Sequence, residues 1–143
     1  MSDPFHPQPV SPGGGRFTGG RVLLVDDEPL ILLVLAGFLQ GHVAECVEAE
    51  SGAQALDLFQ SGAFDLVITD KNMPDIDGLQ LTREIRKRHP TQKVLLISGV
   101  ASQSAHPPPS EGGPDAFLAK PFTRAGVLEC VERLMSPEGR IGA

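Results

Sequence analysis

Short apolar runs recur along the chain, each bounded by charged or polar residues. The runs 22–25 and 94–97 are continuously apolar, which is typical of parallel strands buried on both faces of a sheet. The segment 42–50 interleaves apolar with acidic residues, which favours a strand at the edge. In full, the pattern predicts strands at 22–25, 42–50, 64–69, 94–97 and 116–119.

Segments with helical periodicity and N-terminal capping residues separate these strands. Pro29 suits the first turn of a helix that stops near Gly41. Ser51 to Gln54 is a capping-box pattern, and Asp77 and Thr123 can cap two later helices. Alternating strands and helices imply right-handed crossovers, so we predict an α/β fold with a parallel sheet.

The alternation fails once, between Val100 and Asp115, where a fourth helix should lie. Three consecutive prolines at 107–109 forbid a continuing helix, and Gly112 and Gly113 weaken any restart. We expect an irregular segment at 100–114, with at most one turn around 101–105.

Composition limits the classes of protein. The net charge of −6 argues against nucleic acid as a partner, since clustered basic residues bind phosphate backbones. No apolar run reaches the ~20 residues that span a membrane. Cys46 and Cys130 lack metal-ligand spacing, which suits a reduced, cytoplasmic protein. We expect a disordered Pro/Gly-rich tail at 1–20, one domain at 21–135 and a polar tail at 136–143.

Polar residues end four of the predicted strands, and a parallel sheet places all of these ends at one edge. They are Asp26 and Asp27, Asp70, Ser98 and Lys120. Clustered carboxylates repel each other, and a hard divalent cation such as Mg²⁺ relieves that repulsion. With an ammonium and a hydroxyl added, the set suits phosphoryl transfer, in which Asp70 attacks and the others neutralise phosphoryl oxygens. Taken alone, Asp26 and Asp27 could be a helix cap and Asp70 a turn former, and a Lys-Pro pair after a strand usually has no function.

The order of these motifs resembles the receiver domain of two-component response regulators. The matching stretches are Val-Asp-Asp-Glu at 25–28, Ile-Thr-Asp-Lys-Asn-Met-Pro at 68–74, Leu-Leu-Ile-Ser-Gly at 95–99 and Phe-Leu-Ala-Lys-Pro-Phe at 117–122. The resemblance covers about 21–135. It implies a flavodoxin-like, doubly wound sheet of five parallel strands in the order 2-1-3-4-5.

The resemblance also implies a role for each residue. Asp70 would be the phosphoacceptor, and Asp26 and Asp27 would hold Mg²⁺ with Asp70 and the backbone carbonyl of Asn72. Ser98 would be the switch hydroxyl, Phe117 the switch aromatic and Lys120 the phosphate contact, followed by a cis bond to Pro121. The implied partners are a histidine kinase or histidine phosphotransfer protein and a downstream protein target. We expect a phosphorelay protein without a DNA-binding output domain, not an enzyme, although it could hydrolyse its own phosphoryl group.

Three features depart from the family pattern. Without a fourth helix, we hypothesise that phosphorylation changes the order of 100–114. Val100 cannot hydrogen-bond a water, which predicts a long-lived phosphoryl group. The helix 29–40 is apolar nearly all round, which suggests an exposed patch for a kinase, a phosphotransfer helix bundle or a second copy, as in a homodimer. The alternative is a fully covered core helix.

Three other functions fit less well. A phosphatase of the haloacid dehalogenase type needs an Asp-x-Asp pattern after its first strand, which Asp26-Asp27-Glu28 does not supply. A flavin-binding module needs a glycine- and hydroxyl-rich phosphate loop there. An interaction module with a vestigial pocket would not need the complete polar set.

Overall fold

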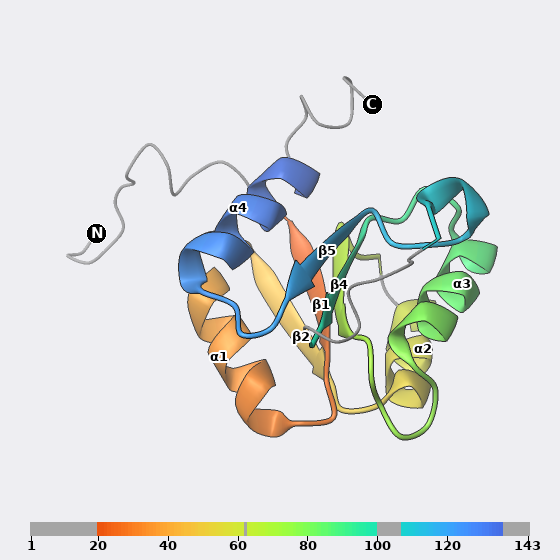
Figure 1. Ribbon diagram of the computed structural model, residues 1–143, viewed down its shortest axis with the longest axis horizontal. Coiled ribbons are helices and arrows are strands. Elements are labelled where there is room, and N and C mark those ends of the chain that lie inside the picture. The colour runs from red at the N-terminus through yellow and green to blue at the C-terminus, as the bar shows by residue number, and fades with distance from the viewer. Residues whose placement is uncertain (1–19, 62, 100–106, 136–143) are drawn as a thin grey trace.

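The computed structural model describes residues 20–61, 63–99 and 107–135. In them, five parallel strands form one sheet in the order β2-β1-β3-β4-β5, flanked by helices (Figure 1). This confirms the predicted flavodoxin-like α/β fold. The strands are β1 (Arg21–Val25), β2 (Glu45–Ala49), β3 (Leu66–Asp70), β4 (Val94–Ser98) and β5 (Ala116–Ala119). The helices are α1 (Pro29–Leu39), α2 (Gly52–Ser61), α3 (Gly78–Arg88) and α4 (Arg124–Met135), with the short 3₁₀ helix η3 (Pro109–Glu111).

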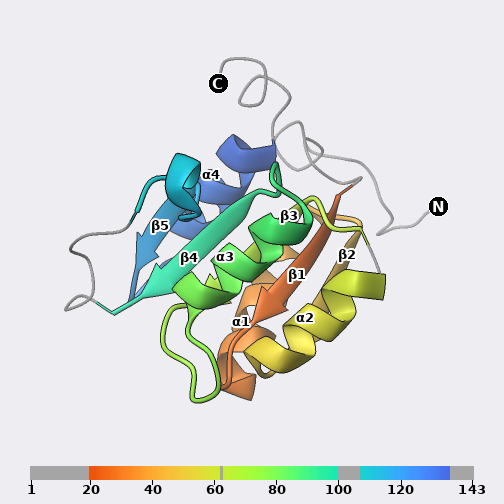
Figure 2. The ribbon, with the colours of Figure 1, turned by 90° about the vertical axis from the view of Figure 1, so that its right-hand side faces the viewer.

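Helices cover both faces of the sheet. Helices α1 and α4 lie on one face, and α2 and α3 lie on the other (Figures 1 and 2). Alternate residues of each central strand enter opposite cores, so that Leu24 and Ile68 pack toward α1 and α4 while Leu23 and Val67 pack toward α2 and α3. This double burial explains why the central strands are continuously apolar.

The three predicted helix caps are present. Asp77 accepts a hydrogen bond from the Gln80 amide at 2.8 Å, and Thr123 Oγ1 accepts one from the Gly126 amide at 3.0 Å. Ser51 Oγ accepts from the Gln54 amide at 3.0 Å. The Gln54 side chain returns its bond to the amide of Glu50, at 2.8 Å, so the capping box closes one residue earlier than predicted.

The edge strand is shorter than the predicted 42–50. The amides of His42 and Val43 bond the carbonyl of Leu39, and Gly41 adopts a left-handed φ of 85°. These residues therefore form the turn that ends α1, and β2 begins only at Glu45. Strands β3 and β4 run one residue further than predicted, so Asp70 and Ser98 are their last residues, and β3 begins at Leu66 and not at the predicted Phe64.

The segment after β4 contains no α-helix among residues 107–115. It forms the single turn η3, where the Gly112 amide bonds the Pro109 carbonyl at 3.0 Å. The described part thus agrees with the prediction of an irregular segment, and the turn expected at 101–105 lies outside the described residues. So do Val100, the tail at 136–143 and all of the tail at 1–20 except Gly20.

Helix α1 is apolar on its outer face as well as its inner one. Leu32, Leu35 and Leu39 are buried, whereas Leu30 and Leu33 are 72% and 66% exposed. The prediction of an exposed apolar patch is therefore confirmed, and the alternative of a fully covered core helix is wrong. In the described part of the chain, no helix is long and apolar enough to cross a membrane.

Candidate functional site

The parallel sheet brings the predicted polar residues to one edge. Asp26 and Asp27 follow β1, Asp70 and Ser98 end β3 and β4, and Lys120 follows β5. Backbone hydrogen bonds tie the neighbouring strand ends together, since the Lys120 amide donates to the Ser98 carbonyl at 2.7 Å. Such an edge is where open α/β sheets place their ligands.

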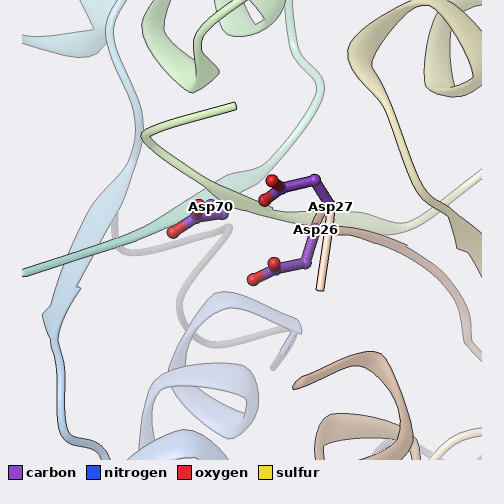
Figure 3. A group of neighbouring side chains, drawn as sticks. All are labelled: Asp26, Asp27 and Asp70. Carbon is purple, nitrogen blue, oxygen red and sulfur yellow. The ribbon is translucent and has the colours of Figure 1, made fainter. Parts of the chain in front are cut away.

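Three carboxylates form the centre of the site. One oxygen from each of Asp26, Asp27 and Asp70 lies within 4.8 Å of the others. Figure 3 shows that the carboxylates of Asp26 and Asp27 point to the same side, toward Asp70. Asp26 and Asp70 are 2% and 5% exposed, whereas Asp27 is exposed. The site therefore holds two buried acids with an open acidic rim.

Burial raises the pKa of both inner carboxyl groups. The pKa of Asp26 rises from 3.8 to about 6, because desolvation outweighs the hydrogen bond from the Glu28 amide and Asp70 adds its negative charge. The pKa of Asp70 is also raised by burial, although Lys120 opposes the shift. The protein thus holds acidic groups where their negative charge is unfavourable.

Lys120 provides positive charge within the cluster. Its Nζ lies 3.0 Å from Oδ1 of Asp70. Burial lowers the pKa of Lys120, but the hydrogen bond to Asp70 and the nearby carboxylates outweigh burial and raise it. The ammonium therefore stays charged beside the Asp70 carboxylate.

The donor set fits a hard divalent cation such as Mg²⁺. Carboxylate oxygens are the ligands that Mg²⁺ prefers, and it retains several waters, which an open rim permits. A single ammonium opposite three acids leaves excess negative charge that a dication would balance. Asp26, Asp27 and Asp70 would hold the ion.

The remaining predicted residues differ in their burial. Ser98 is fully buried, and its Oγ makes no hydrogen bond with any described residue. Asn72 is exposed in the loop after β3. Phe117 is half-buried on β5, opposite Leu96 of β4. The Lys120–Pro121 bond is cis, as the resemblance implies.

The sequence did not identify the role of Asp75. Its carboxylate accepts hydrogen bonds from the amides of Gly52 and Ala53 at 3.2 and 2.8 Å. Burial raises the pKa of Asp75, but these bonds and that from Ile76 together outweigh burial and lower it overall. Asp75 thus fastens the loop after Asp70 to the start of α2, and only its place in an acidic turn hinted at a role.

Gly78 is the other residue with an unpredicted role. A Cβ at this position would collide with the carbonyl oxygen of Asp70 and lie 2.8 Å from Cδ1 of Leu96. The start of α3 therefore packs directly beneath the end of β3, which fixes the backbone of Asp70.

Residues 22–132 match the response regulator receiver domain. The chain belongs to this family. It is therefore a receiver domain of the kind found in two-component systems, as the order of its motifs suggested.

Known relatives match most of the chain. The chemotaxis protein CheY of Bacillus subtilis is 31% identical over 117 residues, which are 81% of this chain and 98% of that protein. A structure of the response regulator protein TrrA from Thermotoga maritima, in complex with Mg²⁺-BeF, is 38% identical with a TM-score of 0.72. It covers 80% of this chain and 98% of its own.

Other relatives are much longer than the matched segment. The transcriptional regulator NtrC of Escherichia coli (strain K12) is 33% identical over 82% of this chain but only 25% of its own length. The sensor kinase CckA of Brucella abortus is 33% identical over 82% of this chain and 13% of its own length. The receiver unit thus occurs within proteins of different overall function.

Proposed function

We propose that Asp70 is the phosphoacceptor of this receiver domain and that Mg²⁺ supports the reaction. The observation that carries the proposal is the placement of Asp70 between a charged lysine and two further carboxylates. Family membership and the Mg²⁺-BeF complex of TrrA support it.

Each group has a role in phosphoryl transfer from a phosphohistidine to Asp70. An Asp70 carboxylate oxygen attacks the phosphorus of a phosphohistidine, the P–N bond breaks, and the histidine leaves with the electron pair. Lys120 contacts a phosphoryl oxygen in place of its present contact with Asp70. Asp26, Asp27, Asp70 and the carbonyl of Asn72 would hold Mg²⁺, which when bound neutralises phosphoryl oxygen charge.

Ser98 is the proposed switch hydroxyl. Its buried Oγ has no described hydrogen-bond partner, and a buried donor gains when an acceptor arrives. A phosphoryl oxygen on the neighbouring strand end supplies that acceptor, and Phe117 would adjust its position in response. Because the protein modifies its own side chain, it acts as a signalling module and not as an enzyme on external substrates.

Membership of the family supports a histidine-containing phosphodonor. Receiver domains receive phosphate from histidine kinases or histidine phosphotransfer proteins, and the relatives include a sensor kinase. The phosphorylated form then contacts a downstream protein in the cytoplasm.

Intact mass after incubation with acetyl phosphate tests the proposal. We expect one phosphoryl adduct on the wild type with Mg²⁺, none with EDTA, and none on Asp70→Asn. Asp57→Asn is the matched control, because Asp57 is an exposed carboxylate on α2 and should keep the adduct. A folded wild-type protein without any adduct would contradict the proposal and favour the vestigial interaction module.

A further inference from the structure

The outer face of α1 carries an apolar stripe that the other described residues leave exposed. Leu30, Leu33, Val34 and Gly37 are all exposed and follow the i, i+3, i+4, i+7 spacing of one helix face. Among the described helices, α1 is the only one without a charged residue. In a chain with a net charge of −6, a second copy could therefore approach the middle of this stripe with less repulsion between like charges than at the other described helices.

The stripe has a projection at one end and a hollow at the other. Leu30 is the most exposed large apolar side chain among the described residues, whereas a Cβ added to Gly37 would meet no atom within 4 Å. A groove of about 470 Å³ lies beside Gly37, lined also by Leu33, Gly41, Val43 and Cys46. The helix therefore offers both a side chain to insert and a space to receive one.

Projection and hollow lie at equal distances from the middle of the stripe, between Leu33 and Val34. When two identical helices pair antiparallel about that point, Leu30 of one faces Gly37 of the other, and Leu33 faces Val34. Each contact then occurs twice, as a two-fold interface requires. A glycine at the contact also lets the two backbones approach closely.

The charges at the two ends of α1 favour the same orientation. Asp27 and Glu28 are exposed at its start. At its far end, the exposed Arg124 of α4 places Nη2 3.4 Å from Nε2 of His42. Antiparallel pairing brings the acidic start of one helix toward the basic end of its partner, whereas parallel pairing brings acid to acid.

We infer that α1 is a self-association face, through which two copies of this chain pair antiparallel with Leu30 seated beside the partner's Gly37. A single helix face falls below the ~1,200 Å² of standard stable interfaces, so the dimer is weak and dissociates on dilution. Pairing through α1 does not require phosphorylation of Asp70.

Sedimentation velocity from about 5 µM to about 500 µM tests the inference, a range suited to a small interface. We expect the wild type to shift from monomer to dimer. Leu33→Glu should weaken association about tenfold or more, because it buries a charge. Gln60→Glu is the matched control, since it adds the same charge to an exposed position of α2, on the opposite face of the sheet.

A substitution that adds apolar surface distinguishes this specific packing from non-specific hydrophobic association. Gly37→Leu fills the hollow, so it should weaken the dimer, and adding Leu30→Ala should restore association. Arg124→Glu should also weaken the dimer.

Three results would overturn the inference. The first is a wild type that stays monomeric throughout, and the second is a dimer that Leu33→Glu leaves unchanged. The third is a monomeric protein whose α1 variants instead lose phosphoryl transfer from a histidine-containing helix bundle. That result would show that the stripe on α1 binds the phosphodonor and not a second copy of this chain.

Discussion

The buried carboxyl of Asp26 lowers the stability of the metal-free protein. Its carboxyl is 2% exposed and lies beside two other acids, and burial raises its pKa to about 6. In the unfolded chain this carboxyl ionises near the ordinary value of 3.8, whereas in the folded protein it keeps its proton up to about pH 6. The free energy of unfolding therefore falls as the pH rises from 3.8 through about 6. A buried acid of this kind destabilises the metal-free protein at neutral pH.

Asp26→Asn should therefore stabilise the metal-free protein at pH 8, by about 1–3 kcal/mol in the free energy of unfolding. Asparagine keeps an oxygen that can accept the bond from the Glu28 amide, now 2.9 Å from Asp26 Oδ1. The gain should shrink as the pH falls from about 6 and vanish well below 3.8, where both folded and unfolded carboxyl groups are protonated. Urea denaturation in EDTA across this range measures it. A variant less stable than wild type at pH 8 would contradict the account.

At the scale of elements, the start of α3 determines where Asp70 lies. Gly78 allows α3 to begin against the carbonyl of Asp70, and its amide donates to the Lys71 carbonyl at 2.7 Å. Asp75 ties the same loop to α2. The acceptor is thus fixed by its own strand and by two helices.

Gly78→Ala should lower the free energy of unfolding by about 1–3 kcal/mol, because the added methyl group has no room. Gly37→Ala is the matched control, since nothing lies within 4 Å of its Cβ position and alanine favours a helix interior by about 1 kcal/mol. Urea denaturation compares them. Equal stability of Gly78→Ala and wild type would show that α3 does not pack as closely as described.

The local elements were largely predictable, whereas the contacts between them were not. Apolar runs predicted the strands, and Ser51, Asp77 and Thr123 were predicted as caps because capping acts within three residues. Asp75 caps α2 although it lies 22 and 23 residues further along the chain than the two amides that donate to it. The pattern of residues near Gly52 gives no sign of such a distant capping residue. The sequence also placed β2 too early, because Val43 looks like a strand residue but lies in the turn after α1.

At the scale of the whole molecule, one topology assembles the site. Five residues from four separate segments of the chain gather because the strands are parallel and end at the same edge, so their proximity could be predicted before any distance was known. Ser98 is placed on β4 at this edge, but its burial and lack of a described partner needed the structure. The stripe on α1 was predicted as exposed, but its self-complementary ends were not.

Mg²⁺ should stabilise the whole domain through this edge. A ligand at about 100 times its Kd adds about 2.7 kcal/mol to the folded state, which raises the Tm by several degrees in a domain of this size. Asp27→Asn should remove most of that increase while changing the metal-free Tm little, since Asp27 is exposed. Asp57→Asn should keep the full increase. Thermal unfolding with Mg²⁺ or EDTA checks this, and an equal response of both variants would contradict the assigned site.

Asp70 itself should receive the phosphoryl group, and mapping the modified residue shows whether it does. Borohydride reduces an aspartyl phosphate to an alcohol, which peptide mass spectrometry can locate. After phosphorylation with Mg²⁺, we predict the reduced side chain at position 70 and unmodified Asp26 and Asp27. Reduction at Asp26 or Asp27, with position 70 unchanged, would contradict the account.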